Sequence, residues 1–327
     1  MTAVFARRTA LAAAFALAAT GAVAQAYPTR PITMIVPFAA GGPTDVIARI
    51  VGDHMSKTLG QTVVIENVLG VGGTTGIARG AGATPDGYTV MMGHMGTHGA
   101  APALYPNLKY DPAKDFTPIG LAAGTPIVIV AKKDFPATDL KGFVAYVKEN
   151  GAKLNMAHAG VGSVSHTTGV LLTSVLGIKP NLVPYRGTGP ALNDLMANTV
   201  DFMADQIVNV STQISGGTIT GYAVATPERN PALPDLPTTR EGGLDGYQVS
   251  AWNAVFGPKA LPKDVAAKLS DALDKALDDA NTRKRILDLG GVVPTKAERT
   301  PEALQKLVES EVARWTPILK AAGAVAN

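Results

Sequence analysis

Two series of short β-rich runs and amphipathic helical segments follow each other along the chain. The first series opens with the apolar run 32–36, and the helix that follows has apolar residues three and four apart from Val46 to Leu59. The second series opens after the extended run 126–131 and ends near residue 225. Because strands that alternate with helices form parallel sheets with helices on both faces, the sequence predicts two α/β units.

The part of the chain after the second unit predicts how the units are joined. A proline-rich connector leads to another extended run at 247–252, and the rest is helical, over 262–280 and 301–322. This last part has little sheet of its own, so we expect it to pack on the first unit after the chain has crossed between units twice. The predicted lobes are lobe I, residues 27–125 plus 251–327, and lobe II, residues 126–250. Two extended crossings form a hinge on which lobes close around a ligand.

Residues 1–26 have the three parts of a secretory signal peptide. Arg7 and Arg8 precede an apolar run over 9–19, and small residues allow cleavage after Ala26. The apolar run is shorter than the roughly 20 residues that span a bilayer. We expect export by the Sec route rather than by the twin-arginine route, because only the arginine pair matches the latter.

Charge and cysteine content exclude several classes of protein. The leader holds two of the 29 basic residues and none of the 26 acidic ones, so its removal lowers the net charge from +3 to +1. A nearly neutral chain without a basic cluster is not expected to bind nucleic acid. A chain without cysteine has no disulfide framework and no thiolate metal site. Beyond the leader, no run of 18 apolar residues predicts a membrane span.

Each unit places a glycine-rich loop between a strand and the next helix. The loop 37–44 contains Gly41 and Gly42, and the loop 159–166 contains two glycines followed by Ser163. A helix start presents free N–H groups and a partial positive charge, so it accepts a carboxylate or phosphate without a basic side chain. The alternative is that the glycines only make the turn and the hydroxyl residues only cap the helices. Two loops of this design at one cleft suit a small anion.

Polar side chains after other strands add candidates for ligand contact. The guanidinium of Arg186 suits a carboxylate, although a surface or interlobe salt bridge is an equal alternative. Asp205 ends its strand, where it suits an ammonium or hydroxyl group of a ligand or caps the next helix. His94 and His98 stand four residues apart, but the glycines beside them and the lack of a third ligand argue against a metal site.

Two enzyme classes compete with a binding protein. Ser163 and His166 allow a secreted α/β hydrolase, yet no G-x-S-x-G elbow is present and no acid is spaced to orient His166. Gly41-Gly42 and Glu66 stand where a nucleotide enzyme has its fingerprint, but the G-x-G-x-x-G spacing and a Walker A sequence are absent. The sequence favours binding without chemistry and keeps the hydrolase as the alternative.

The motifs around these loops resemble a known family. They are Tyr27-Pro28-Thr29-Arg30-Pro31-Ile32, the run 36–45, Glu66-Asn67 with the turn 70–73, the run 85–89, Leu104-Tyr105, Tyr110-Asp111-Pro112, Asp115-Phe116, the loop 160–166, the run 183–187 and Gly257-Pro258. Together they span nearly all of the chain after the leader. They are similar to the Bug/TctC family, the periplasmic solute-binding receptors of tripartite tricarboxylate transporters.

The resemblance implies an α/β fold of the two-lobe periplasmic-binding-protein kind, type II-like, with a mainly parallel sheet flanked by helices in each lobe and the ligand cleft between the lobes. It implies that lobe closure captures a small carboxylate, which is a di- or tricarboxylate, an acidic amino acid or an aromatic acid, and that the receptor delivers it to membrane permease subunits. We expect a periplasmic monomer without nucleic-acid partner, cofactor, metal site or catalytic residue.

The residue patterns and the resemblance together predict the ligand-binding residues. They are Phe38, Ala40, Gly41, Gly42, Thr44, Asp45, Thr97, His98, Gly162, Ser163, His166, Arg186 and Asp205. Two positions depart from the family pattern, since Val68-Leu69 stands where Lys-Pro is frequent and Arg186 stands where lysine is frequent. The planar guanidinium of arginine has several N–H donors in a fixed arrangement, whereas the ammonium of lysine is a compact charge, so the two side chains tolerate different groups beside them.

Overall fold

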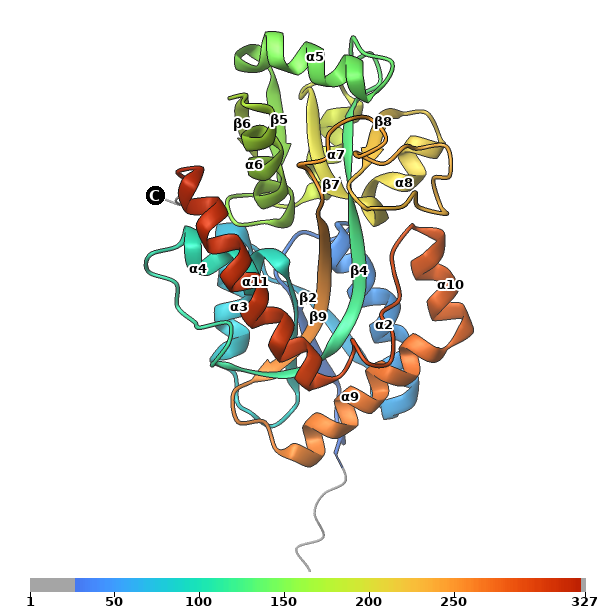
Figure 1. The fold of residues 1–327 in the computed structure, drawn as a ribbon. Coiled ribbons are helices and arrows are strands. Elements are labelled where there is room, and N and C mark those ends of the chain that lie inside the picture. The colour runs from blue at the N-terminus through green and yellow to red at the C-terminus, as the bar shows by residue number, and fades with distance from the viewer. Residues whose placement is uncertain (1–26, 325–327) are drawn as a thin grey trace, which may run out of the picture.

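The computed structural model describes residues 27–324, so the predicted signal peptide lies outside the described residues (Figure 1). Within them, nine strands form one curled sheet of order β2-β1-β3-β9-β4-β7-β5-β6, with β8 paired to β4. The strands are β1 (Ile32–Val36), β2 (Val63–Asn67), β3 (Thr89–His94), β4 (Phe116–Lys132), β5 (Asn155–His158), β6 (Asn181–Pro184), β7 (Phe202–Gln206), β8 (Ile219–Val224) and β9 (Ser250–Pro258).

Helices pack on both faces of this sheet. The α-helices are α2 (Pro43–Leu59), α3 (Thr74–Ala81), α4 (Ala101–Leu104), α5 (Leu140–Asn150), α6 (Val164–Leu176), α7 (Thr188–Met196), α8 (Ile207–Ser215), α9 (Lys263–Asp278), α10 (Ala280–Asp288) and α11 (Pro301–Ala321). Shorter helical turns are η1 (Val71–Gly73), η2 (Met95–Ala100) and η3 (Gly151–Lys153). The predicted α/β fold is confirmed.

Strands β4 and β9 run between two halves of the molecule (Figure 1). We call the part around β1, β2 and β3 the β1 half, and the part around β5, β6 and β7 the β5 half. From Phe116 to Pro126 strand β4 pairs with β9, and from Ile127 onward it pairs with β7 and β8. These pairings are antiparallel, whereas β1 pairs in parallel with β2 and β3, and β5 with β6 and β7. Each half therefore keeps a parallel group of strands beside the two long strands.

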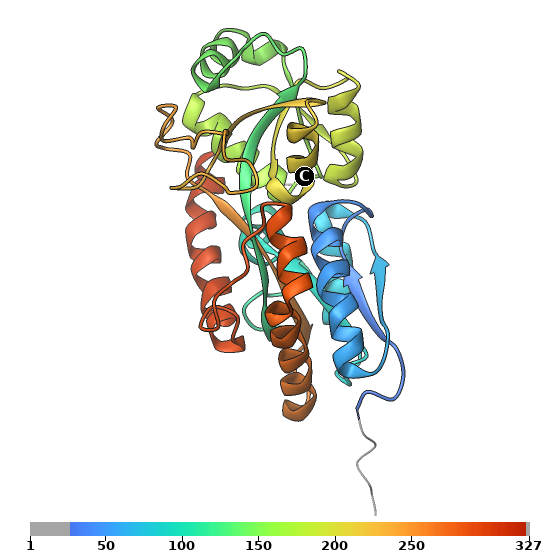
Figure 2. The same ribbon diagram turned by 90° about the vertical axis from the view of Figure 1, so that its right-hand side faces the viewer.

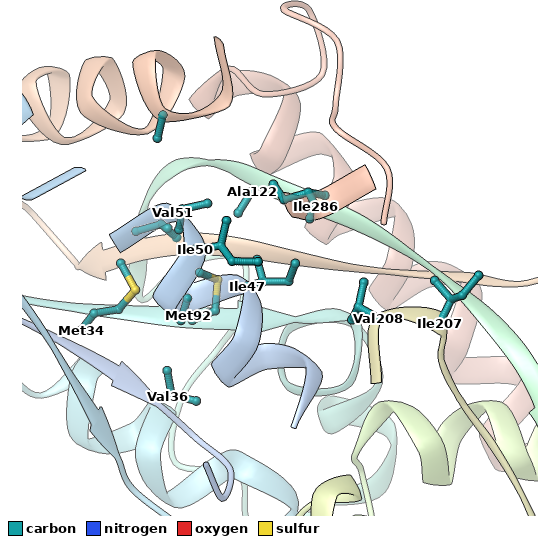
Figure 3. Close-up of a cluster of buried hydrophobic side chains, with 14 of the residues drawn as sticks. Met34, Val36, Ile47, Ile50, Val51, Met92, Ala122, Ile207, Val208 and Ile286 are labelled. Carbon is teal, nitrogen blue, oxygen red and sulfur yellow. The ribbon is translucent and has the colours of Figure 1, made fainter. Parts of the chain in front are cut away.

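Alternation along β1 divides the core of the β1 half into two layers, because successive residues of a strand point to opposite faces of the sheet. Met34 and Val36 belong to the buried cluster that contains Ile47 of α2 (Figure 3). Ile35 belongs to the cluster on the other face, with Trp315 of α11. Figure 2 shows these layers, with α11 on one side of β9 and α2 on the other.

The C-terminal helices differ from the prediction at one point. The sequence predicted one helix over 262–280, but α9 ends at Asp278 and α10 begins at Ala280. The backbone of Asp279 is extended, and its carboxylate accepts the N–H of Thr282 at 2.8 Å, so this residue starts a new helix. No helix within 27–324 is both long and apolar enough to cross a membrane.

Candidate ligand-binding site

Four helices begin around one pocket between the two halves. Their N-cap residues are Gly42 for α2, Ser163 for α6, Gly187 for α7 and Gln206 for α8. The first N–H groups of a helix have no partner inside the helix and carry a partial positive charge. The pocket is lined by Phe38, Gly42, Pro43, Thr44, His94, Ala159, Ser163, Val164, Ser165, Thr188 and Gln206. This wall contains no lysine or arginine and no carboxylate, so helix starts and neutral polar side chains face the pocket.

The two halves touch each other around this pocket. The N–H of Ala39 donates to the carbonyl of Arg186 at 3.4 Å, and the hydroxyl of Tyr105 donates to the carbonyl of Val161 at 2.5 Å. Gly72 of η1 lies so close to Val161 that a Cβ atom at Gly72 would be 1.7 Å from that carbonyl oxygen. The remaining cavity has a volume of about 20 Å³, which is room for one or two water molecules. The halves are therefore closed on each other, and the pocket has room for a small group of atoms and not for a whole ligand of several carbon atoms.

Asp45 fixes the loop in front of α2. Its carboxylate accepts the N–H of Gly41 at 3.0 Å, the amide of Asn67 at 2.9 Å and both Nε and a terminal nitrogen of Arg49, at 2.8 and 2.9 Å. Burial opposes its charge, but the bonds from Arg49, Gly41 and Asn67 leave the pKa of Asp45 below its usual value. Asn67 also donates to the carbonyl of Phe38 at 2.9 Å. The Asp45 carboxylate thus points into the loop, not into the pocket.

Gln206 is oriented by the two long strands. Its Oε1 accepts the hydroxyl proton of Thr125 on β4 at 2.7 Å and an amide proton of Asn253 on β9 at 3.3 Å. Both hydrogen bonds go to the oxygen, so the amide N–H groups of Gln206 remain for the pocket. Thr125 and Asn253 are fully buried where the chain passes between the halves. The pocket wall and the crossing strands are therefore connected by hydrogen bonds.

His94 is the buried residue that ends β3 and lines the pocket, and its ring stacks on Phe38 with 5.0 Å between the ring centres. Its Nδ1 accepts the N–H of Gly96 at 2.9 Å and the N–H of Thr97 at 3.2 Å. Burial lowers the pKa of His94 to about 3. The imidazole is neutral at physiological pH.

Ser163 and His166 do not form a nucleophile and base pair. The Ser163 hydroxyl accepts the backbone N–H of His166 at 3.2 Å, which is an N-cap bond, and Nδ1 of His166 accepts the N–H of Gly162 at 3.3 Å. The ring beside His166 is that of His158, 4.8 Å away between centres, and not a carboxylate. Burial and His158 lower the pKa of His166 to about 3, so it is a weak base. This geometry gives the hydrolase alternative no support.

Thr97, His98 and Asp205 lie behind the pocket wall. Thr97 bonds to the His94 backbone and to His98, and the His98 ring stacks on Phe256 at 4.0 Å between centres. Asp205 is fully buried, and its Oδ2 accepts the Asn209 amide at 2.5 Å. Burial raises the pKa of Asp205 to about 7, although hydrogen bonds from Asn209, the Gln206 backbone and Thr188 oppose the rise.

The other predicted residues lie at or beside the pocket. Phe38, Gly42, Thr44 and Ser163 line it. Ala40 and Gly41 are exposed in the loop before α2, and Gly162 is buried in the loop before α6. Arg186 is exposed and lines an outer groove that also contains Phe38, Tyr105 and the η1 turn. Phe38 and Ala159 line both spaces, so they lie between the pocket and the outer groove.

The predicted set of ligand-binding residues leaves out several residues of the wall. They are Pro43, His94, Ala159, Val164, Ser165, Thr188 and Gln206. Their position carried the signal, because each lies at the carboxyl end of a strand or in the first turn of the next helix, where open α/β sheets bind ligands. The sequence placed His94 in a loop with polar side chains at the rim of the cleft and argued against it as a metal ligand, but did not predict it as a ligand-binding residue. Within residues 27–324, no group of three or more His, Asp or Glu side chains is placed to hold a metal ion.

A family model described as the tripartite tricarboxylate transporter family receptor, TctC, matches residues 47–324. The chain belongs to the TctC family. The solved structure of MatC from Rhodopseudomonas palustris with bound malate has 48% sequence identity and a TM-score of 0.87, over 90% of this chain and all of that one. The structure of the periplasmic binding protein BugD has 44% identity and a TM-score of 0.88, over 92% of this chain and all of that one.

A further solved structure, an R. palustris protein with adipate, has 31% identity and a TM-score of 0.87, over 92% of this chain and all of that one. These likenesses confirm the predicted membership of the Bug/TctC family and the periplasmic-binding-protein fold. The TctC family is a family of periplasmic solute-binding receptors.

Proposed function

We propose that this TctC receptor binds one small carboxylate in the pocket where α2, α6, α7 and α8 begin. The observation that carries the proposal is the convergence of four helix N-termini on a wall with buried hydroxyl groups and no charged side chain. Such a wall stabilises an anion through N–H groups and helix dipoles. Support comes from two similar structures, one with bound malate and one with adipate.

The two halves act as lobes in this proposal. Lobe I is residues 27–125 with 251–327, lobe II is residues 126–250, and β4 and β9 form the hinge between them. One carboxylate would bridge α2 of lobe I and α6, α7 and α8 of lobe II, and so stabilise the closed state by binding it more tightly than the open one. Arg186 at the outer groove would meet the second charged group of a dicarboxylate.

The proposed role ends with delivery of the carboxylate to permease subunits in the membrane. No catalytic step, cofactor or metal takes part, and the receptor acts in the periplasm as a monomer after export by the Sec route. The geometry of Ser163 and His166 supports this, since neither side chain is oriented as a nucleophile or a strong base.

Calorimetric titration with succinate, malate, adipate, glutamate and benzoate tests the proposal. The wild-type protein is expected to bind at least one of them, and Gly42→Asp is expected to abolish binding because it adds a negative charge at the helix start. Gly82→Asp is the control, because Gly82 is exposed and has a φ of −85°, close to the −81° of Gly42. A Cβ atom added at either glycine would be 3.6 Å from its nearest neighbouring atom. Equal affinity of the Gly42 variant and the control would contradict the proposal, as would esterase turnover that is lost in Ser163→Ala.

A further inference from the structure

We propose that His94 donates the proton on its Nε2 atom directly to the bound carboxylate. This inference rests on the proposed function and adds a specific residue to it. His94 is 1% exposed, lines the pocket and stacks its ring on Phe38.

The hydrogen bonds of His94 fix which ring nitrogen carries the proton. Nδ1 accepts the N–H of Gly96 and the N–H of Thr97, and these two donors leave no place for a proton on that nitrogen. A neutral imidazole carries one proton, which must therefore be on Nε2. Thr97 completes the arrangement, because its hydroxyl accepts the backbone N–H of His94 at 3.2 Å. The tautomer is set by the backbone turn and does not depend on the ligand.

The Nε2–H group has no other acceptor in the structure. No hydrogen bond joins it to any residue between 27 and 324, although its ring is almost completely buried. Nε2 is not one of the enclosed polar atoms that lack a partner, so it is open to the pocket, and a ligand oxygen there gains a hydrogen bond without displacing a protein partner. The Phe38 ring, tilted by 24° from the imidazole plane, holds the ring from one side.

The donor also determines which chemical group the pocket accepts. The helix starts offer N–H donors, Gln206 has its amide N–H groups free for the pocket, and His94 adds another donor. A group that only accepts, such as an ionised carboxylate, satisfies all of them, whereas an ammonium group satisfies none. The titratable residues beside or behind this wall include Asp45, His98, His158, His166 and Asp205, and all five are buried.

The substitutions His94→Asn and His94→Gln separate the two nitrogens of the ring. The Oδ1 atom of asparagine stands near the place of Nδ1 and accepts the Gly96 and Thr97 N–H groups, so His94→Asn keeps the turn but lacks the donor. The longer glutamine side chain returns an N–H near the place of Nε2. His158→Asn is the matched control, because His158 is 2% exposed and its Nδ1 accepts the Gly160 N–H at 3.1 Å, but it does not line the pocket.

Calorimetry is done with the carboxylate of the panel that the wild-type protein binds most tightly, and malate is tried first. His94→Asn is expected to bind this carboxylate 10- to 100-fold more weakly, which is the range for the loss of one hydrogen bond to a charged group. His158→Asn should match wild type, and His94→Gln should regain part of the loss. Nitrogen-15 NMR of the histidine rings should show an Nε2–H tautomer for His94 in the free protein, with its proton shifted downfield when the carboxylate binds.

Two results would overturn the inference without touching the proposed function. One is wild-type affinity in a folded His94→Asn variant, and the other is an Nδ1–H tautomer or an unshifted Nε2–H proton in the complex. A wild-type protein that binds no carboxylate of the panel would instead overturn the proposed function, and the inference with it.

Discussion

Gly72→Ala is expected to prevent the two halves from closing on a ligand. Gly72 belongs to η1 in the β1 half and faces Val161 in the loop before α6 of the β5 half. An added Cβ would be 1.7 Å from the Val161 carbonyl oxygen and 2.7 Å from the Tyr105 hydroxyl. Cβ atoms essentially never come within 3.0 Å of other heavy atoms, so the two loops would have to separate by more than 1 Å.

The expected loss of affinity follows from the contacts that span the pocket. A separation of this size moves the helix starts of one half out of hydrogen-bonding distance of a carboxylate held by the other. Each hydrogen bond to a charged group contributes roughly 1.5–3 kcal/mol, so the loss of two such bonds costs about 3–6 kcal/mol. Since 1.4 kcal/mol is about a factor of ten, affinity should fall at least about 100-fold.

Gly60→Ala controls for the backbone cost of the substitution. Gly72 has φ of 59° and Gly60 has φ of 68°, so alanine costs about 1 kcal/mol at either position, but nothing lies within 4 Å of a Cβ at Gly60. Calorimetry with malate should give wild-type affinity for Gly60→Ala and strongly reduced affinity for Gly72→Ala. Small-angle scattering should show that malate compacts wild type but not Gly72→Ala. Affinity within threefold of wild type for a folded Gly72→Ala protein would refute the closure argument.

Three other substitutions test separate parts of the account. Burial raises the pKa of Asp205 from 3.8 to about 7, so the folded wild-type protein should lose stability as the pH rises from about 4 to about 7, by at most about 4 kcal/mol. Thermal unfolding of Asp205→Asn should lack this loss, and equal pH profiles of the two proteins would contradict the burial argument. Asp45→Ala removes the acceptor for Gly41, Arg49 and Asn67, so denaturant unfolding should show a protein destabilised by roughly 2–4 kcal/mol, and malate binding should be at least tenfold weaker. Unchanged stability and affinity would show that the Asp45 carboxylate does not hold the loop. Tyr105→Phe removes the hydroxyl that donates to the Val161 carbonyl across the cleft. Stopped-flow measurements should therefore show that malate dissociates severalfold faster, with little change in its association rate. An unchanged dissociation rate would mean that this hydrogen bond does not stabilise the closed state.

Much of the fold could be predicted from local patterns in the sequence. The apolar spacing of α2, its glycine C-cap at Gly60 and the short strands around it are local signals, and the structure has them where the patterns place them. The boundary between α9 and α10 was not predicted because apolar spacing continues through it, and the decisive feature is one capping side chain, Asp279.

The site could be predicted only where local sequence determines it. A glycine-rich loop before a helix is visible in the sequence, so Gly42 and Ser163 were found. Thr188 and Gln206 belong to helix starts that reach the pocket only because the sheet order brings β5, β6 and β7 together. One hydrogen-bond partner of Asp45, Asn67, comes from β2 and is distant in the sequence. The sequence therefore could not show that the Asp45 carboxylate bonds within the loop and does not face the pocket.

A crystal structure of the protein grown with malate would show directly where the carboxylate lies. We expect one carboxylate group in the pocket between the starts of α2 and α6, with an oxygen within hydrogen-bonding distance of Nε2 of His94 and the halves closed around it. Malate bound only in the outer groove beside Arg186, with the pocket left to water, would contradict the account.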